Sequence, residues 1–228
     1  FTPLLASAAT GTIEFRSMTE PVRNANPMIH EYMEGSATGL DVKKKTVTVQ
    51  LNKLADEKEP VTIEVPYDQL VVSVGAKVHD FNVAGVKEHA LKLKTIDDAR
   101  TIREAIAASF EHASSPDIAG TATEDEERTR RATFLIAGGG PTGVELAGEL
   151  SDLIADVTRK HKGAYPKLEG KTRVIVVEGG PTLVPPFNEK LRAVALKSLQ
   201  EQGVEVLLNT FATEIGEKYA KLSAQQFD

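Results

Sequence analysis

The sequence contains no cysteine, and this absence excludes several kinds of chemistry. Without cysteine the chain has no disulfide framework, no thiolate nucleophile and no sulfur ligand for a metal. The histidines also lack the spacing of a metal-binding motif, so we expect them on the surface or in loops and expect no metal site. They are His30, His79, His89, His112 and His161.

Long apolar runs and basic blocks are missing as well. The run LVVSVGA at 70–76 is much shorter than the roughly 20 residues of a membrane-spanning helix. The formal net charge is −6, so nucleic-acid binding is not expected. The opening residues FTPLL lack the basic start and apolar core of a signal peptide. Because the chain opens at Phe1 and its first methionine is Met18, we expect an internal piece of a longer protein.

The first half of the chain contains alternating apolar residues that are typical of half-buried strands. Residues 46–51 (TVTVQL) and 61–65 (VTIEV) alternate in this way on either side of a polar loop at 52–60. They predict an antiparallel hairpin within a three-stranded meander. The continuous apolar run at 68–76 (DQLVVSVGA) predicts a further strand, buried on both faces as in a parallel sheet.

A helix is predicted at 95–114. Thr95 and Asp98 have the spacing of a capping box, and apolar residues spaced by three and four share one face of the predicted helix. These residues are Ile96, Ala99, Ile102, Ile106 and Phe110. The following stretch, 114–131, is polar and rich in small residues, which indicates a linker or a solvated insertion.

The second half of the chain alternates strands with helices. The pattern predicts a strand at 133–137, a glycine turn at 138–143, a helix at 142–159, a strand at 173–178, a helix at 188–202 that ends before Gly203, and a strand at 204–208. The order βαβαβ is half of a doubly wound parallel sheet, so the predicted fold class is α/β.

The glycine turn has the G-x-G-x-x-G spacing of a dinucleotide-binding loop. Gly138 permits the tight turn, Gly140 lets the backbone approach a pyrophosphate, and Gly143 lets helix and strand pack closely. Pro141 suits the first helical turn, where its missing N–H costs nothing. The helix N-terminus then offers free N–H groups and a partial positive charge to the phosphates.

An acidic residue, Glu178, ends the next predicted strand. Such an acid accepts hydrogen bonds from the adenosine ribose and repels a 2′-phosphate, which favours NAD over NADP. Glu178 lies 35 residues after Gly143, whereas the usual spacing is about 20, so we expect an insertion around 160–171. The alternative is a structural glycine turn with an incidental acid.

Two further acids, Glu145 and Glu149, share one face of the helix predicted after the glycine turn. Both could simply face solvent. Glu149, however, stands among Leu146, Ala147 and Leu150, where burial would raise its pKa and suit it to proton handling. The sequence leaves these two interpretations open.

With these motifs laid out, the chain resembles the type II NADH dehydrogenases, the single-subunit, non-proton-pumping NADH:quinone oxidoreductases of mitochondria and bacteria. Four ordered stretches carry the resemblance: FTPLLASAATGTIEFRS at the start, YDQLVVSVGA at 67–76, FNVAGVKEHALKLKTIDDARTIREAI at 81–106, and FLIAGGGPTGVELAGEL at 134–150. The first stretch is similar to mitochondrial members in particular.

The resemblance implies two incomplete Rossmann-like domains. Residues 1–114 would belong to an FAD-binding domain that includes the antiparallel meander but not its own glycine turn, 115–131 would be a linker, and 132–228 would belong to an NADH-binding domain. Pro3 would lie near the flavin ring, Ala37 near the FAD adenosine, and Gly75 with Ala76 would close on FAD from a strand end.

The resemblance also assigns the second half of the chain to NADH. Glu178 would bind the ribose, and Glu149 would lie near the nicotinamide and flavin as the catalytic carboxylate. The NADH pyrophosphate would be held by Gly138, Gly139, Gly140, Pro141, Thr142 and Gly143.

The implied activity is hydride transfer from NADH to FAD, followed by reduction of a ubiquinone-type quinone, at the mitochondrial inner membrane. Peripheral membrane association would come from a C-terminal part outside this sequence, and a homodimer is compatible with the resemblance. Because its FAD cradle would be missing, this chain alone is expected to hold FAD weakly and to be inactive. The alternatives are another flavoprotein reductase, such as one with a ferredoxin-type acceptor, and a non-catalytic NADH-binding module.

Overall fold

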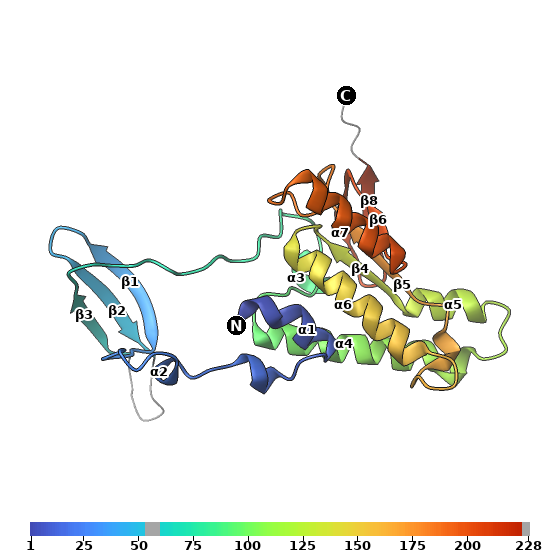
Figure 1. Ribbon diagram of the computed structural model, residues 1–228, viewed down its shortest axis with the longest axis horizontal. Helices are drawn as coiled ribbons and strands as arrows, with labels where there is room; N and C mark the ends of the chain where they lie inside the picture. The colour runs from blue at the N-terminus through green and yellow to red at the C-terminus, as the bar shows by residue number, and fades with distance from the viewer. Residues whose placement is uncertain (53–59, 225–228) are drawn as a thin grey trace. The chain divides into compact units, whose positions relative to one another are not determined.

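The computed structural model describes residues 1–52 and 60–224 of the chain (Figure 1). The contacts divide the chain into two compact units. The larger unit combines Phe1–Thr19 with Lys77–Asp228, and the smaller unit is Glu20–Ala76. The chain therefore leaves the larger unit early and returns to it after the smaller one.

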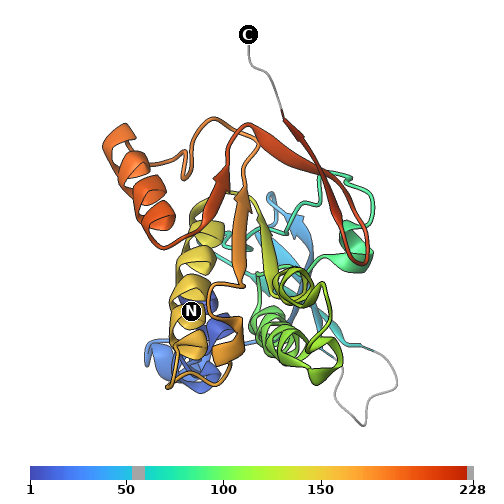
Figure 2. The same ribbon diagram turned by 90° about the vertical axis from the view of Figure 1, so that its right-hand side faces the viewer.

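A three-stranded parallel sheet forms the centre of the larger unit. Its strands are β4 (Thr133–Ala137), β5 (Arg173–Val177) and β6 (Glu205–Leu207), in the order β4-β5-β6. Helix α6 (Pro141–Thr158) connects β4 to β5, and α7 (Glu189–Glu201) connects β5 to β6. Figure 2 shows α6 running alongside these strands. The predicted βαβαβ unit and the α/β fold class are confirmed.

Helix α4 (Ile96–Ser114) matches the helix predicted at 95–114. The Thr95 hydroxyl accepts a hydrogen bond from the Asp98 N–H at 3.2 Å, and the Asp98 carboxylate accepts one from the Thr95 N–H at 2.8 Å, which is the predicted capping box. The predicted apolar face is buried, except that Ile96 is half-buried. The Phe110 ring packs edge-on against Phe134 of β4, with 5.7 Å between the ring centroids.

Helix α1 (Leu5–Thr10) was not predicted, and it packs on both α4 and α6. Its Ala8 and Ala9 side chains are completely buried, because small residues allow the close approach of neighbouring helices. The helix ends at Gly11, whose φ of +86° is the left-handed conformation that glycine adopts without strain. The start of the chain is thus bound to residues more than 80 positions away.

Helix α5 (Glu124–Arg131) lies in the stretch interpreted as a linker or solvated insertion. Acidic residues fill its first turn and basic residues its last, which complements the helix dipole. Arg128 is only 1% exposed; it pairs with Glu124 at 2.8 Å and donates to the Ala113 carbonyl at the end of α4. The charges of this segment therefore stabilise a docked helix as well as solvating the surface.

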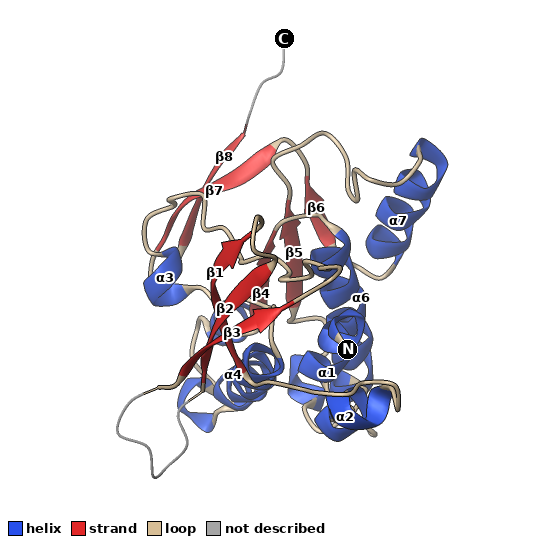
Figure 3. Ribbon diagram, turned by 90° about the vertical axis from the view of Figure 1, so that its left-hand side faces the viewer, coloured by secondary structure: helices blue, strands red, loops and turns tan. Residues whose placement is uncertain are grey.

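Other elements of the larger unit complete its edges. An antiparallel hairpin of β7 (Thr210–Ile215) and β8 (Ala220–Ala224) follows β6, as Figure 3 shows. The short helix α3 (Val86–His89) packs against β7. The loop from α6 to β5 holds the residues expected as an insertion. The described residues of this unit also form four short 3-10 helices: η1 (Thr2–Leu4), η2 (Phe15–Met18), η3 (Pro116–Ile118) and η4 (Pro166–Leu168).

The smaller unit is an antiparallel sheet of β1 (Gly35–Asp41), β2 (Thr46–Leu51) and β3 (Thr62–Pro66), preceded by the short helix α2 (Val22–Ala25). This confirms the predicted hairpin and meander. The register of β1 shifts between Ala37 and Gly39, which is an irregularity of the bulge type. Most of the loop predicted at 52–60 lies outside the described residues.

The prediction of a buried strand at 68–76 is wrong. These residues form no strand, and their apolar side chains are exposed, with Val71 at 86% and Val74 at 85%. A buried strand requires neighbours that pair with its backbone groups and cover its faces, and no described strand pairs with this segment. The apolar composition of this run favours a buried strand, but among the described residues no strand pairs with it and its side chains are exposed.

In 1–52 and 60–224, no helix combines the length and the apolar character that a membrane crossing needs.

Candidate functional site

The glycine turn joins the end of β4 to the start of α6 and has the expected close contacts. Gly138 adopts a φ of +116°, and its N–H donates to the Val177 carbonyl of β5 at 2.8 Å. A Cβ atom on Gly143 would lie 2.0 Å from the Gly138 carbonyl oxygen. Any side chain at Gly143 would therefore push the helix away from the turn.

The opposite side of the turn is open. A Cβ on Gly140 would meet nothing within 4 Å, so there is free space beside the backbone at this position. Pro141 occupies the first helical position, Thr142 is exposed, and no side chain caps the N-terminus of α6. The helix dipole and the backbone N–H groups therefore face a space that could accept an anionic group.

Glu178 follows β5 and lies directly against the glycine turn. One carboxylate oxygen accepts a hydrogen bond from the Gly139 N–H at 2.7 Å, and the other accepts one from the Gly180 N–H at 2.7 Å. Because two backbone donors hold it, the carboxylate has a fixed orientation beside the turn. Gly180 was not predicted as part of the site, since only the folded turn brings its N–H to Glu178.

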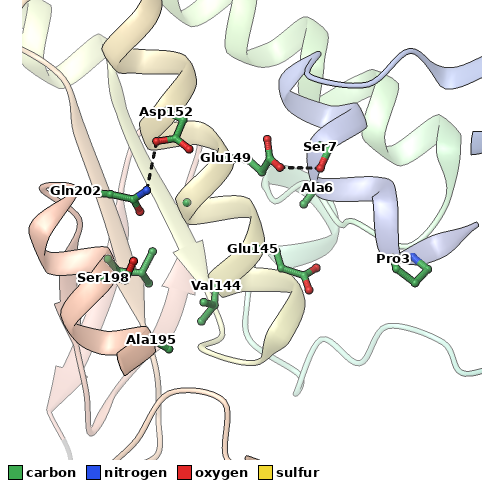
Figure 4. Close-up of a pocket in the computed structure, with 12 residues that line it drawn as sticks. Pro3, Ala6, Ser7, Val144, Glu145, Glu149, Asp152, Ala195, Ser198 and Gln202 are labelled. Atoms are coloured by element: carbon green, nitrogen blue, oxygen red, sulfur yellow. Dashed lines mark hydrogen bonds between the residues drawn. The ribbon is translucent and has the colours of Figure 1, made fainter. Parts of the chain in front are cut away.

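A second feature of the larger unit is an open groove between α1, α6 and α7, with a volume of about 330 Å³ (Figure 4). Its polar lining includes Glu145, Glu149 and Asp152 along α6, and Gln202 beyond α7 donates to Asp152 at 3.2 Å. Pro3 and Ser7 border the groove from the start of the chain.

The two acids left open by the sequence differ in their surroundings. Glu145 is exposed, as expected for a solvent-facing carboxylate, whereas Glu149 is half-buried. The Glu149 carboxylate accepts hydrogen bonds from Ser7 at 2.7 Å, Thr12 at 2.8 Å and Thr10 at 3.4 Å. These three hydroxyls could not be predicted from a local pattern, because they lie about 140 residues from Glu149 along the chain.

The residues expected near FAD lie in different parts of the chain. Pro3 is exposed in η1 of the larger unit. Ala37, Gly75 and Ala76 are exposed in the smaller unit, where Gly75 has a left-handed φ of +69°. Their roles toward FAD stay predictions.

A βαβ unit with a glycine turn, an open helix N-terminus and an acid at the second strand end is the arrangement of dinucleotide-binding proteins of the α/β class. A family model described as pyridine nucleotide-disulphide oxidoreductase matches residues 1–226. The chain belongs to this family. It lacks the cysteine pair that the family description suggests, since it has no cysteine.

Relatives with known descriptions are similar over nearly the whole chain. One is the external alternative NAD(P)H-ubiquinone oxidoreductase B2, mitochondrial, of Arabidopsis thaliana, with 35% identity over 96% of this chain and 36% of the relative. Another is the external NADH-ubiquinone oxidoreductase 2, mitochondrial, of Saccharomyces cerevisiae, with 38% identity over 97% of this chain and 39% of the relative. The chain thus spans less than two-fifths of either protein. These relatives confirm the resemblance to type II NADH dehydrogenases.

A solved structure with the same architecture is NDH2 from Plasmodium falciparum in complex with NADH. It superposes with a TM-score of 0.79 and 26% identity, over 98% of this chain and 44% of that protein.

Proposed function

We propose that this chain is part of a mitochondrial NADH:quinone oxidoreductase of the non-electrogenic, FAD-containing type and that it supplies the NADH-binding turn. The observation that carries the proposal is the geometry around Gly140. Open space on one side, the α6 N-terminus and the fixed Glu178 carboxylate together fit a dinucleotide that lies across the turn. The descriptions of the relatives and the Plasmodium complex with NADH support the same assignment.

Each part of the turn has a task in the proposal. The N-terminus of α6 and the turn at Gly138–Gly143 bind the pyrophosphate through backbone N–H groups other than those of Gly138 and Gly139, which donate to Val177 and Glu178. Glu178 accepts hydrogen bonds from the adenosine ribose hydroxyls, and its negative charge repels the 2′-phosphate of NADPH. The groove carboxylate Glu149 orients groups at the nicotinamide end and handles protons there.

The proposal for FAD and quinone concerns the whole protein. Residues 1–114 contribute to the FAD-binding domain, with Pro3 at the flavin ring, Ala37 near the adenosine, and Gly75 with Ala76 against the cofactor; 115–131 links it to the NADH-binding residues 132–228. FAD bound by these residues would supply the chemistry that takes up a hydride from NADH and passes electrons to a ubiquinone-type quinone. The protein is peripheral on the mitochondrial inner membrane, and a homodimer is part of the proposal.

The test is calorimetric titration of the 228-residue chain with NADH and NADPH. We expect NADH to bind and NADPH to bind at least about tenfold more weakly. Glu178→Gln should weaken NADH binding by roughly tenfold to a hundredfold, since hydrogen bonds to a charged group contribute about 1.5–3 kcal/mol. The same substitution should reduce the preference for NADH over NADPH.

The matched control is Glu126→Gln, which removes an exposed acid from α5. Helix α5 precedes β4, whereas the glycine turn follows it, so this control changes the net charge equally at the other end of the strand. Equal affinity for NADH and NADPH in the unsubstituted chain would contradict the role of Glu178. Turnover with a ferredoxin but not with a quinone in the whole protein would favour the other flavoprotein reductases.

A further inference from the structure

The Glu149 carboxylate on α6 is held by hydroxyl groups from the start of the chain. Its Oε1 atom accepts a hydrogen bond from Ser7 Oγ at 2.7 Å, and its Oε2 atom accepts one from Thr12 Oγ1 at 2.8 Å. Figure 4 shows the first of these contacts at the groove. Each carboxylate oxygen therefore has one short donor of its own, so rotation of the carboxylate would break at least one bond.

Thr10 lies next to both Thr12 and the Glu149 carboxylate. Its Oγ1 atom lies 3.2 Å from Thr12 Oγ1 and 3.4 Å from Glu149 Oε2. A hydroxyl has one proton to donate, and the Thr12 proton is best placed on the carboxylate at 2.8 Å. The Thr10 hydroxyl also lies 3.2 Å from the Ser7 carbonyl and 3.3 Å from the Ala6 carbonyl, so its one proton has several acceptors and Thr10 is a weaker donor to Glu149 than Ser7 or Thr12.

The local backbone explains why three hydroxyls converge. Ser7 and Thr10 lie three residues apart on one side of α1. Gly11 ends the helix in the left-handed conformation, and the chain turns back so that Thr12 lies beside Thr10. A residue other than glycine at this position would be strained, so the turn itself is part of the arrangement.

The described charged side chains around Glu149 in the groove are acidic. Among the described residues, none of the ion pairs includes Glu149, and the other charged side chains lining the groove are the acids Glu145 and Asp152, both on α6. A lysine or arginine can only donate, so it cannot accept a hydrogen bond from the O–H of a protonated carboxyl group. A hydroxyl both donates and accepts, so it also accepts a hydrogen bond from the protonated carboxyl.

We propose that Ser7 and Thr12 are positioning residues that keep the Glu149 carboxyl group in one orientation, with or without a proton. This inference rests on the proposed function, in which Glu149 lies at the nicotinamide end of the NADH site. In this inference, residues at the start of the chain position a carboxylate in the NADH site, whereas the other proposed residues of that site lie after residue 132. Glu149 contacts the reacting groups, and Ser7 and Thr12 act through it.

The test follows the side-chain carboxyl carbon of Glu149 by NMR in the 228-residue chain labelled with ¹³C-glutamate. Glu149→Gln identifies the resonance by its loss. Thr12→Val removes the hydroxyl with little change in shape, and Ser7→Ala removes the other donor. We expect both substitutions to shift the resonance and Thr12→Ser to return it to its original position. Thr101→Val, which removes an exposed hydroxyl from α4, is the matched control and should leave it unchanged.

Titration with NADH then separates positioning from binding. In Thr12→Val the NADH affinity should stay within about twofold, because the hydrogen bonds of Thr12 go to Thr10 and Glu149 and not to the glycine turn or Glu178. The change that NADH causes in the Glu149 resonance should, however, be lost, and Thr12→Ser should regain it. Circular dichroism of each variant shows whether it is folded, and Ser7→Ala provides the same readout if Thr12→Val does not fold.

Two results would overturn the inference. One is a Glu149 resonance that is the same in Thr12→Val, Ser7→Ala and the unsubstituted chain. The other is an unchanged response of that resonance to NADH in Thr12→Val. If the unsubstituted chain fails to bind NADH, the proposed function fails at that step, and the comparison of resonances without NADH still decides whether the hydroxyls hold Glu149.

Discussion

The two three-stranded sheets among the described residues differ in sequence pattern and in how they are covered: β4 and β5 are nearly continuous apolar runs, whereas β2 and β3 alternate. In the parallel sheet of the larger unit, Val176 is completely buried and Val174 and Val177 are at most 5% exposed. In the antiparallel sheet of the smaller unit, no residue of β1, β2 or β3 is buried. The strands of both sheets pair with their neighbours, so pairing alone does not produce a core.

The difference lies in what packs on the sheets. Helices α6 and α7 pack against the parallel strands, and Phe110 of α4 contacts Phe134 of β4. The smaller unit has only the short helix α2 among its described residues, and none of the α2 side chains is buried. Burial of apolar area is the main favourable term in folding, so most of the stability of the chain should reside in the larger unit.

The strongest test of this contrast compares Phe110→Ala with Leu40→Ala. Phe110 is 2% exposed, and its truncation should lower the free energy of unfolding by about 3–5 kcal/mol. Leu40 of β1 is 52% exposed, and its truncation should change that free energy by no more than about 0.5 kcal/mol. Urea denaturation followed by circular dichroism measures both. Equal losses of unfolding free energy would show that side chains of the smaller unit stabilise the chain as much as those of the larger unit.

Close packing and open space can also be compared at two glycines of the turn in the larger unit. Gly143→Ala places a Cβ against the Gly138 carbonyl and should cost about 1–3 kcal/mol, because the helix must move. Gly140→Ala is the matched control: its φ is −73° and its Cβ would meet nothing, so stability should change by less than about 0.5 kcal/mol. The thermal midpoints of the two variants give the comparison. A larger loss for Gly140→Ala would contradict the assignment of the two positions.

The smallest effect concerns pH. Hydrogen bonds from Arg130, and then Arg131, lower the pKa of Glu127 on α5 to about 2 from its ordinary 4.5. Because the folded-state pKa is depressed, the stabilisation is fully present above pH 4.5 and is lost as the pH falls toward 2. Glu127→Gln should therefore reduce the pH dependence of the unfolding midpoint in this window.

The smaller unit supplies the control for that pH dependence. No ion pair involves the described residues of 20–76, so local unfolding of its sheet, followed by hydrogen exchange, should change less with pH than that of the larger unit. A steeper acid response in β1, β2 and β3 would break this part of the comparison.

The sequence predicted those features that depend on neighbours along the chain. The Thr95 capping box, the helix after the glycine turn and the end of α7 before Gly203 all depend on residues within a few positions. The run at 68–76 failed because a strand also needs a partner, and its own residues do not reveal whether one is present. Helix α1 is too short and too rich in small residues to give a periodic signal.

The candidate site divides in the same way. The glycine turn and Glu178 could be predicted because both follow strands of one βαβ unit, whose strand ends meet at one edge of the sheet. The Ser7 and Thr12 contacts to Glu149 could not, because they form only when α1 packs on α6. No local pattern of hydroxyl residues distinguishes these from any other surface hydroxyls.

The discontinuity of the larger unit affects how the chain can vary. Residues 20–76, which form the smaller unit, are an insertion (here called the detour) between η2 and α3 of the larger unit, in which α1 packs on α4 and α6. The entropy of closing such a detour grows only with the logarithm of its length, so doubling it costs only about 0.6 kcal/mol more. The chain could therefore gain or lose residues within the detour at little thermodynamic expense, while a change between α4 and β6 would act directly on the core.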